Sequence, residues 1–186
     1  NLDIIISDDG LTHYGLTRDI NIVIVKENKP FGNGLPIPSG PLRELPYNIE
    51  KYDNIVFNKS INSDLPGFYY EISKLISFND AKERNISSFK NTKIHLVTAI
   101  ANPDFLIRSL EDLNIVVIPH IYPDHELLNQ DDFYFKDDLK VIMTEKDFVK
   151  CINFNLKNTY YIPTKIIVDN DIKIMLNDKI SNLLRI

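Results

Sequence analysis

The sequence lacks several features that define particular classes of protein. Its 186 residues include one cysteine, Cys151, and no tryptophan. A single cysteine excludes an internal disulfide, so cysteine usage gives no sign of an oxidising compartment. A catalytic thiol requires a nearby base, and the sequence does not place one. We therefore interpret Cys151 as a buried, apolar-type side chain.

Long hydrophobic runs are also absent. The longest are Ile4–Ile6 and Ile22–Val25, which have the length of strands, whereas a membrane-spanning helix needs about 20 apolar residues. No signal-peptide pattern opens the chain. Its first residue, Asn1, begins a run typical of a strand interior, so we expect further residues upstream.

A strong charge of one sign is missing as well. The chain has 21 Lys and Arg against 26 Asp and Glu, a formal net charge of -5. A dedicated nucleic-acid-binding protein would show a basic stripe, so this mild acidity argues against nucleic acid as a partner. It leaves room for one basic pocket that binds a phosphorylated substrate. The apolar content of 44% is ordinary for a globular protein.

Short β-rich runs alternate with helical stretches, which predicts an α/β fold. The expected strands are residues 2–7, 20–25, 54–58, 93–98, 114–118 and 141–144, with weaker candidates at 160–163 and 165–168. Helices are expected at 103–113 with Asn102 as N-cap, after Thr144 as the N-cap of a second helix, and at 169–184. The stretch 69–78 is ambiguous between strand and helix. The polar stretch 79–92 marks the expected domain boundary.

An acidic motif follows directly after the first expected strand, at Asp8-Asp9-Gly10-Leu11-Thr12-His13. Side chains at the end of an apolar strand project into the crevice where α/β folds bind ligands. Paired aspartates supply the oxygen ligands that Mg²⁺ prefers. A polar strand–loop junction with a capping aspartate is the alternative interpretation.

Residues 28–48 form a Pro- and Gly-rich loop that ends in Ser39-Gly40-Pro41-Leu42-Arg43-Glu44. Long ordered loops inside a domain are usually functional. Arg43 offers a planar guanidinium suited to phosphate oxygens, and Glu44 is a candidate second Mg²⁺ ligand or a partner of Arg43. A linker with a solvated ion pair is the alternative.

Two further motifs come later in the chain. His120 and His125 flank Tyr122-Pro123-Asp124, which suggests zinc binding, but no convincing third ligand is present. Proton transfer by a loop histidine and a simple surface turn are the alternatives. Lys146, near an expected helix start, is unfavourable for the helix dipole. It either meets an anionic ligand or is a surface lysine.

In their order, these motifs resemble the tetraacyldisaccharide 4'-kinase family. The residues that carry the resemblance are Ile4–His13, Arg18–Ile20, Phe31–Gly34, Pro38–Glu44, Val97–Pro103, Tyr122–His125 and Met143–Asp147. They extend from the start of the chain to about residue 165. The resemblance implies ATP-dependent phosphorylation of the 4'-hydroxyl of a tetraacyldisaccharide 1-phosphate, giving lipid IVA in lipid A biosynthesis.

The resemblance also implies an architecture and a location. Residues 1–80 would be the C-terminal part of a P-loop NTPase-like core, and residues 81–186 a smaller α/β lobe. The enzyme would work at the cytoplasmic face of the bacterial inner membrane. It would reach the membrane surface through an N-terminal segment that this sequence does not contain.

Roles for individual residues follow from the same resemblance. Asp8 and Asp9 resemble the acidic pair beside Mg²⁺ and the phosphates, with Asp9 the preferred metal ligand. Glu44 would join the Mg²⁺–ATP site, with Arg43 on the phosphates and Lys146 as a further anion contact. His13 would orient the substrate or bind its phosphate. His125 would tune a catalytic aspartate that lies upstream of residue 1.

Two departures from the family pattern stand out. Thr12 occupies a position where the family usually has glutamine, and no Gly-x-x-x-x-Gly-Lys-Ser/Thr motif occurs in the 186 residues. We therefore expect little kinase activity from this chain alone. One alternative is a metal-dependent phosphohydrolase that uses the acidic pair with His13, His120 and His125. Another is a non-catalytic module that binds a nucleotide or a lipid phosphate.

Overall fold

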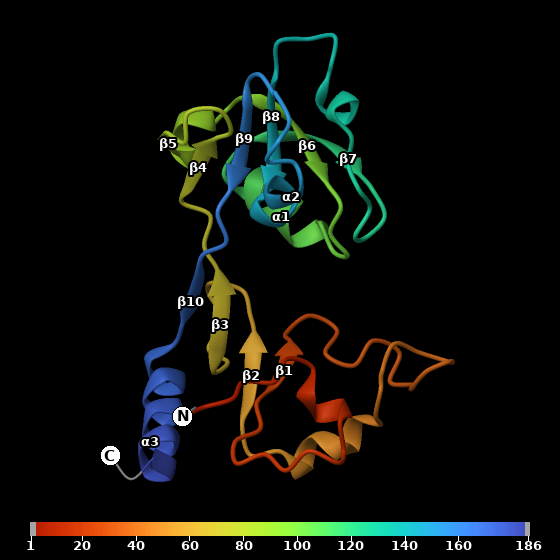
Figure 1. The fold of residues 1–186 in the computed structure, drawn as a ribbon, viewed down its shortest axis with the longest axis vertical. Coiled ribbons are helices and arrows are strands. Elements are labelled where there is room, and N and C mark those ends of the chain that lie inside the picture. The colour runs from red at the N-terminus through yellow and green to blue at the C-terminus, as the bar shows by residue number, and fades with distance from the viewer. Residues whose placement is uncertain (1–2, 185–186) are drawn as a thin grey trace. The chain divides into compact units, whose positions relative to one another are not determined.

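Two β-sheets organise the chain into two units (Figure 1). The computed structural model describes residues 3–184. Unit 1 contains the described residues up to Tyr70 together with those from Ile166 onward, and unit 2 is Glu71–Lys165. The C-terminal segment belongs to unit 1 because strand β10 (Ile166–Val168) pairs antiparallel with strand β3 (Gly67–Tyr70).

Unit 1 is built on a four-stranded sheet in the order β1-β2-β3-β10. Its elements are η1 (Gly10–Thr12), β1 (Val23–Lys26), η2 (Pro46–Lys51), β2 (Ile55–Asn58), β3 (Gly67–Tyr70), β10 (Ile166–Val168) and α3 (Asn170–Leu184). Strands β1, β2 and β3 run parallel. Helix α3 covers the sheet by packing Ile172 against Val56 and Phe68.

Unit 2 is built on a six-stranded sheet in the order β5-β4-β9-β8-β6-β7, in which β9, β8, β6 and β7 are parallel. Its elements are β4 (Lys74–Ser77), β5 (Glu83–Asn85), η3 (Ile86–Phe89), β6 (Lys93–Thr98), α1 (Asp104–Asp112), β7 (Val116–Ile121), η4 (Gln130–Phe133), β8 (Lys140–Thr144), α2 (Glu145–Lys150) and β9 (Thr159–Ile162).

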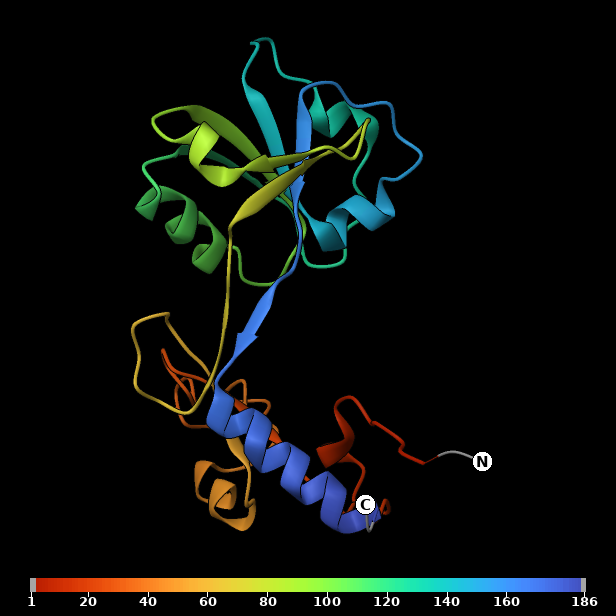
Figure 2. The same cartoon turned by 90° about the vertical axis from the view of Figure 1, so that its left-hand side faces the viewer.

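Two βαβ crossovers, β6-α1-β7 and β8-α2-β9, place their helices on opposite sides of this sheet (Figure 2). Leu106 and Leu110 of α1 belong to one core cluster, with Ile94, while Cys151 after α2 belongs to another, with Val97. The parallel neighbours β6 and β8 therefore connect outward in opposite directions across the sheet, β6 to β7 on one side and β8 to β9 on the other. Ligands of open α/β sheets bind beyond the carboxyl ends of strands at such a point.

Most of the expected strands are confirmed. The apolar run 93–98 is β6 to the residue, and the runs expected at 20–25, 54–58, 114–118, 141–144, 160–163 and 165–168 correspond to β1, β2, β7, β8, β9 and β10 with shifted ends. The ambiguous stretch 69–78 contains the end of β3 and the whole of β4. Thr144 is confirmed as the N-cap of α2, since its side chain accepts a hydrogen bond from Asp147 N.

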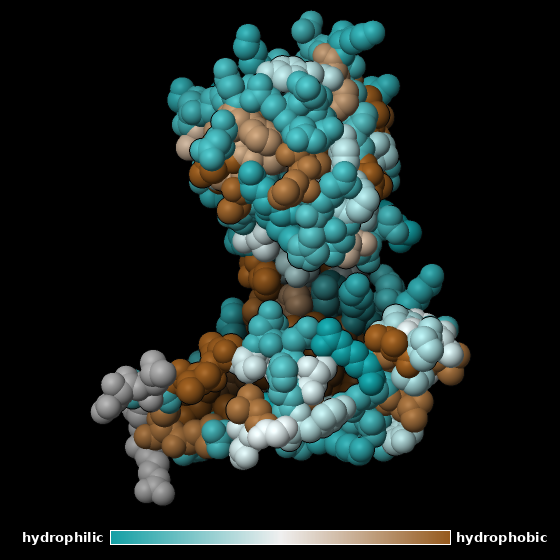
Figure 3. Space-filling view, turned by 45° about the vertical axis from the view of Figure 1, so that its right-hand side comes forward, coloured by the Kyte–Doolittle hydropathy of each residue, from teal (hydrophilic) through white to brown (hydrophobic). Residues whose placement is uncertain are grey.

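The strand expected at 2–7 is wrong for residues 3–7, and Leu2 lies outside the described residues. No residue from 3 to 7 belongs to a strand, and Ile6 is 91% exposed. An apolar run forms a strand only where a neighbour supplies hydrogen bonds, and the unit 1 sheet is formed without this segment. Apolar surface gathers on part of unit 1 (Figure 3).

Two other expectations differ from the structure. Helix α1 begins at Asp104 with Pro103 as its N-cap residue, rather than with Asn102 as the cap. The polar stretch 79–92 does not separate two units, because it contributes β5 and η3 to unit 2. The boundary lies at 70/71 instead, and it depends on the long-range pairing of β10 with β3.

We predict that Gly67→Ala destabilises unit 1. Gly67 opens β3 where the backbone of β2 passes so close that an added Cβ would overlap the Phe57 carbonyl oxygen. Backbone cannot yield as a flexible side chain can, so the expected loss in the free energy of unfolding is about 3 kcal/mol. Gly15→Ala is the control, since an added Cβ there meets nothing within 4 Å. Equal urea midpoints for the two variants would contradict the prediction.

Candidate functional site

The turn after residue 8 presents the Asp9 carboxylate to Arg43. Asp9 has a left-handed backbone, with φ 55, and it precedes η1 without using its side chain as a cap. Its Oδ2 lies 3.1 Å from Nη2 of Arg43. The turn is fixed by Arg18, whose Nη1 donates to the carbonyl oxygens of Gly10 and His13. The two motifs expected to act together are therefore in direct contact.

A second bond joins the same two segments. The Tyr14 hydroxyl donates to Oε1 of Glu44 at 2.9 Å, and Asn48 Nδ2 donates to Oε2 at 3.1 Å. The hydrogen bond to Glu44 and the charge of that carboxylate raise the pKa of Tyr14. Sequence reasoning missed Tyr14 and Asn48. The only signal in the sequence was the position of Tyr14 directly after the acidic motif.

The Pro- and Gly-rich loop is ordered by its own hydrogen bonds. A bridge pairs Pro36 with Leu42, and Asn33 Nδ2 donates to the Ser39 carbonyl oxygen at 2.9 Å. Gly40 lies so close to the Leu35 carbonyl that a side chain would overlap it. This closed loop holds the segment that leads into Arg43.

The oxygen donors of this cluster suit Mg²⁺. No group of three or more His, Cys, Asp or Glu side chains that could hold a metal occurs within residues 3–184. Mg²⁺ usually takes only one or two carboxylates and completes its shell with water and phosphate oxygens. Asp9 and Glu44 supply two carboxylates in this cluster, one on each of the two linked segments. The remaining expected residues of the motif, Asp8 and His13, are exposed.

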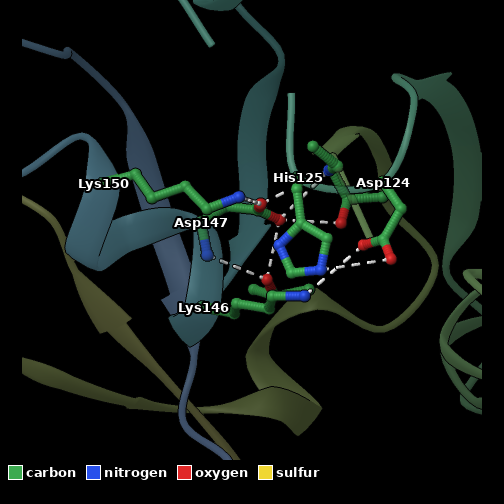
Figure 4. A network of polar contacts seen from close by, with 8 residues as sticks. Asp124, His125, Lys146, Asp147 and Lys150 are labelled. Carbon is green, nitrogen blue, oxygen red and sulfur yellow. Dashed lines mark hydrogen bonds and ion pairs between the residues drawn. The ribbon is translucent and has the colours of Figure 1, made fainter. Parts of the chain in front are cut away.

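A separate cluster lies at the carboxyl ends of β6 and β8 in unit 2 (Figure 4). Its centre is Asp147, whose relative exposure is 0%. The hydroxyls of Thr98 and Thr144 each donate to Oδ2 at 2.7 Å, and Ala99 N donates to the same carboxylate at 3.3 Å. Lys150 Nζ lies 3.9 Å from Oδ1, buried and without a hydrogen-bond partner among the described residues.

The exposed part of this cluster contains His125. Asp124 lies between an imidazole and an ammonium group, with Oδ2 3.5 Å from His125 Nε2 and Oδ1 3.4 Å from Lys146 Nζ. His125 has φ 66, which is unusual for a residue other than glycine, and its N–H donates to the Ala99 carbonyl oxygen. Lys146 meets Asp124 in this structure, a partner that sequence reasoning did not name.

His120 belongs to a different group from His125. Nδ1 of the buried His95 lies 2.9 Å from His120 Nε2, and His95 Nε2 lies 3.1 Å from Asp137 Oδ1. Phe135 stacks on the His95 ring, with 3.7 Å between ring centroids. Since a carboxylate can only accept, His95 carries its hydrogen on Nε2 and accepts at Nδ1 from His120 Nε2–H. In a neutral His120 the Nδ1 atom then carries no hydrogen.

Charge and burial shift the pKa values in this group. Burial and then the neighbouring His95 lower the pKa of His120. Burial raises the pKa of Asp137, but hydrogen bonds from His95 and Leu139 outweigh it and the net pKa is lowered. Elsewhere in unit 2, burial and then Asp147 raise the pKa of Cys151 to about 11. The thiol is buried, as expected from the sequence.

Comparisons with known proteins agree on one family. The family model for tetraacyldisaccharide-1-P 4'-kinase matches residues 1–181. The tetraacyldisaccharide 4'-kinases of Hahella chejuensis and Nitrosococcus oceani are 40% and 37% identical to this chain, over 86% and 87% of it. Those matches cover 48% of each relative, so the chain spans about half the length of the curated relatives it matches.

A solved structure shares the fold. The crystal structure of the apo form of LpxK from Aquifex aeolicus in complex with ATP is similar to this chain, with a TM-score of 0.64 and 22% identity. The match covers 94% of this chain and 56% of that one. The α/β class expected from the sequence is confirmed.

We predict that Asp147→Ala destabilises unit 2. The substitution leaves Thr98, Thr144 and Ala99 N without their shared buried acceptor and removes the ionic partner of Lys150, so the expected loss in the free energy of unfolding is about 3 kcal/mol. Asp138→Ala is the matched control, because Asp138 is exposed in the same unit and should change stability by less than about 0.5 kcal/mol. Similar losses in both variants, measured by urea unfolding, would refute the role of Asp147.

The lowered pKa of His120 predicts that acid destabilises unit 2. An unfolded His120 has an ordinary pKa of about 6.5, so below that pH the unfolded chain binds a proton that the folded chain does not. The free energy of unfolding should fall as pH drops through about 6.5 towards the lower folded pKa. His120→Gln should flatten this slope, whereas His13→Gln, which alters an exposed histidine, should keep it. Unfolding curves at several pH values measure both slopes.

Proposed function

Since the chain belongs to the tetraacyldisaccharide-1-P 4'-kinase family, we propose that it carries part of the site of an ATP-dependent lipid kinase. The reaction transfers the γ-phosphoryl group of ATP to the 4'-hydroxyl of a tetraacyldisaccharide 1-phosphate, in lipid A biosynthesis. Unit 1 is proposed as the part of the kinase core that binds metal and nucleotide, and unit 2 as the smaller lobe. The ATP named for the solved relative supports the nucleotide assignment.

The observation that carries the proposal is the double link between two motifs of unit 1. Arg43 binds Asp9, and Tyr14 binds Glu44. These bonds bring two carboxylates and a guanidinium from segments 30 or more residues apart onto facing stretches of chain. That combination fits phosphoryl transfer, in which the protein mainly positions groups and neutralises charge.

In the proposed site, Asp9 and Glu44 hold Mg²⁺. When bound, the ion neutralises charge on the phosphate oxygens of ATP. Arg43 has a planar fork that suits phosphate oxygens, and it exchanges Asp9 for them when the nucleotide is present. Asp8 lies next to the metal ligands as an additional acidic group, and His13 orients the substrate or contacts its phosphate.

Unit 2 is proposed to contribute to proton transfer and anion binding. His125 is exposed and lies beside Asp124, which gives its imidazole a charged neighbour that orients it. Its proposed role is to tune the aspartate that takes the proton of the 4'-hydroxyl, a residue outside this sequence. Lys146 is proposed as an anion contact that Asp124 holds when the ligand is absent.

The proposed location is the cytoplasmic face of the bacterial inner membrane, with contact to the membrane surface through a segment outside these 186 residues. Family membership and a lipid substrate support it. Within the described part of the chain, no helix combines the length and the apolar character needed to cross a bilayer.

We predict that the chain binds Mg²⁺–ATP but turns it over slowly, because its 186 residues contain no Gly-x-x-x-x-Gly-Lys-Ser/Thr motif. Asp9→Ala should weaken Mg²⁺–ATP binding about tenfold or more, since a contact to a charged group is lost. Asp64→Ala, which removes an exposed carboxylate of the same unit, should have no effect. Calorimetry measures affinity, and an ATPase assay with the lipid acceptor measures turnover. Equal binding by wild type and Asp9→Ala would contradict the proposed role of Asp9, and rates typical of kinases, about 1–100 per second, would contradict the prediction of slow turnover.

A further inference from the structure

We propose that Tyr14 and Asn48 are positioning residues that hold the Glu44 carboxylate ready for a divalent metal ion. The inference rests on the proposed function, in which Glu44 is a metal ligand. It adds two residues that neither the motifs nor the comparisons assign to the site. Both act through Glu44 rather than on the metal or the nucleotide.

The geometry around Glu44 is that of a two-point clamp. Its Oε1 accepts from the Tyr14 hydroxyl at 2.9 Å, and its Oε2 accepts from Asn48 Nδ2 at 3.1 Å. One donor comes from the segment after the acidic motif and the other from η2, so the carboxylate is fixed from two directions. An ionised carboxylate has about four lone-pair sites, so acceptor capacity remains for a metal.

The two donors leave the negative charge of Glu44 available to a metal ion. Tyr14 and Asn48 are neutral, so they orient Glu44 without cancelling its charge. Asp9, in contrast, is paired with the guanidinium of Arg43. Of the two proposed metal ligands, Glu44 is therefore the one that has no ion-pair partner within residues 3–184 and whose two carboxylate oxygens are both hydrogen-bonded.

The clamp is not explained by packing. Tyr14 is 77% exposed, so its ring contributes little to a core. Asn48 Oδ1 is buried and has no hydrogen-bond partner among the described residues. The opposite orientation of the amide would turn that oxygen towards the Glu44 carboxylate, so the charge of Glu44 selects the orientation that leaves Oδ1 unpaired. An unfavourable feature of this kind is expected where an oriented carboxylate has a use.

Residues that orient metal ligands have measurable effects on metal affinity. Removing such a partner typically weakens metal binding by about 10- to 100-fold in well-formed sites. The site here is exposed and offers two carboxylates, so a smaller change is expected. We expect the Tyr14→Phe variant, which keeps the ring and loses only the hydroxyl, to bind Mn²⁺ about three- to tenfold more weakly.

The test is a titration of the whole chain with Mn²⁺ alone, followed by the electron paramagnetic resonance signal of free Mn²⁺. Tyr47→Phe is the matched control, because Tyr47 is 64% exposed and lies three residues from Glu44. Melting curves establish that both variants are folded at the titration temperature. A role in stability alone would shift the melting curve and leave Mn²⁺ affinity unchanged.

The outcomes separate this inference from the proposed function. Weaker Mn²⁺ binding by Tyr14→Phe, with Tyr47→Phe like wild type, supports the clamp. If Tyr14→Phe binds like wild type while Glu44→Gln loses binding, the clamp is wrong and the metal assignment of Glu44 stands. If Glu44→Gln also binds like wild type, or if wild type shows no saturable binding, the metal assignment and the clamp are both wrong.

Discussion

The cluster at the carboxyl ends of β6 and β8 depends on the hydrogen bonds that the buried carboxylate of Asp147 accepts. It accepts hydrogen bonds from Thr98 at the end of β6 and from Thr144 at the end of β8, so one side chain ties together neighbouring parallel strands. Ala99 N donates to the same carboxylate, and the Ala99 carbonyl accepts from the amide of His125. The backbone of His125, which is proposed to tune the catalytic aspartate, is therefore linked through Ala99 to the fully buried carboxylate of Asp147.

Charged groups differ in burial within the unit 2 cluster, and this difference distinguishes a structural role from the proposed ligand-binding roles. Asp147 is fully buried and every polar contact it makes is internal, which is the arrangement that stabilises a fold. Asp124 and Lys146 are exposed, and exposed ion pairs contribute little stability, so their contacts can be exchanged for a ligand at low cost. The Arg43–Asp9 pair of unit 1 is exposed in the same way.

The sequence predicts what depends on local pattern and misses what depends on distant contacts. The run Lys93–Thr98 identifies β6 because its apolar side chains are buried on both faces of a central strand. The run Ile4–Ile6 has a similar composition and forms no strand, since no neighbouring strand pairs with it. Family motifs identify Arg43 and Glu44, but no spacing indicates that Tyr14, 30 residues from Glu44, is its hydrogen-bond donor. The division into units is hidden for the same reason, because it depends on β10 pairing with β3.

The departure from the family pattern at Thr12 has a local physical explanation. Its hydroxyl donates to the Asp9 carbonyl oxygen at 3.0 Å, and its N–H donates to the same atom at 3.3 Å. Both bonds close the turn in which Asp9 adopts a left-handed backbone, a conformation that costs about 1–2 kcal/mol for a residue other than glycine. Because backbone and hydroxyl groups stabilise the turn, the Asp9 carboxylate is not needed as a cap and extends to Arg43. A threonine at this position therefore supports the presentation of Asp9, where a longer amide side chain could reach a ligand directly.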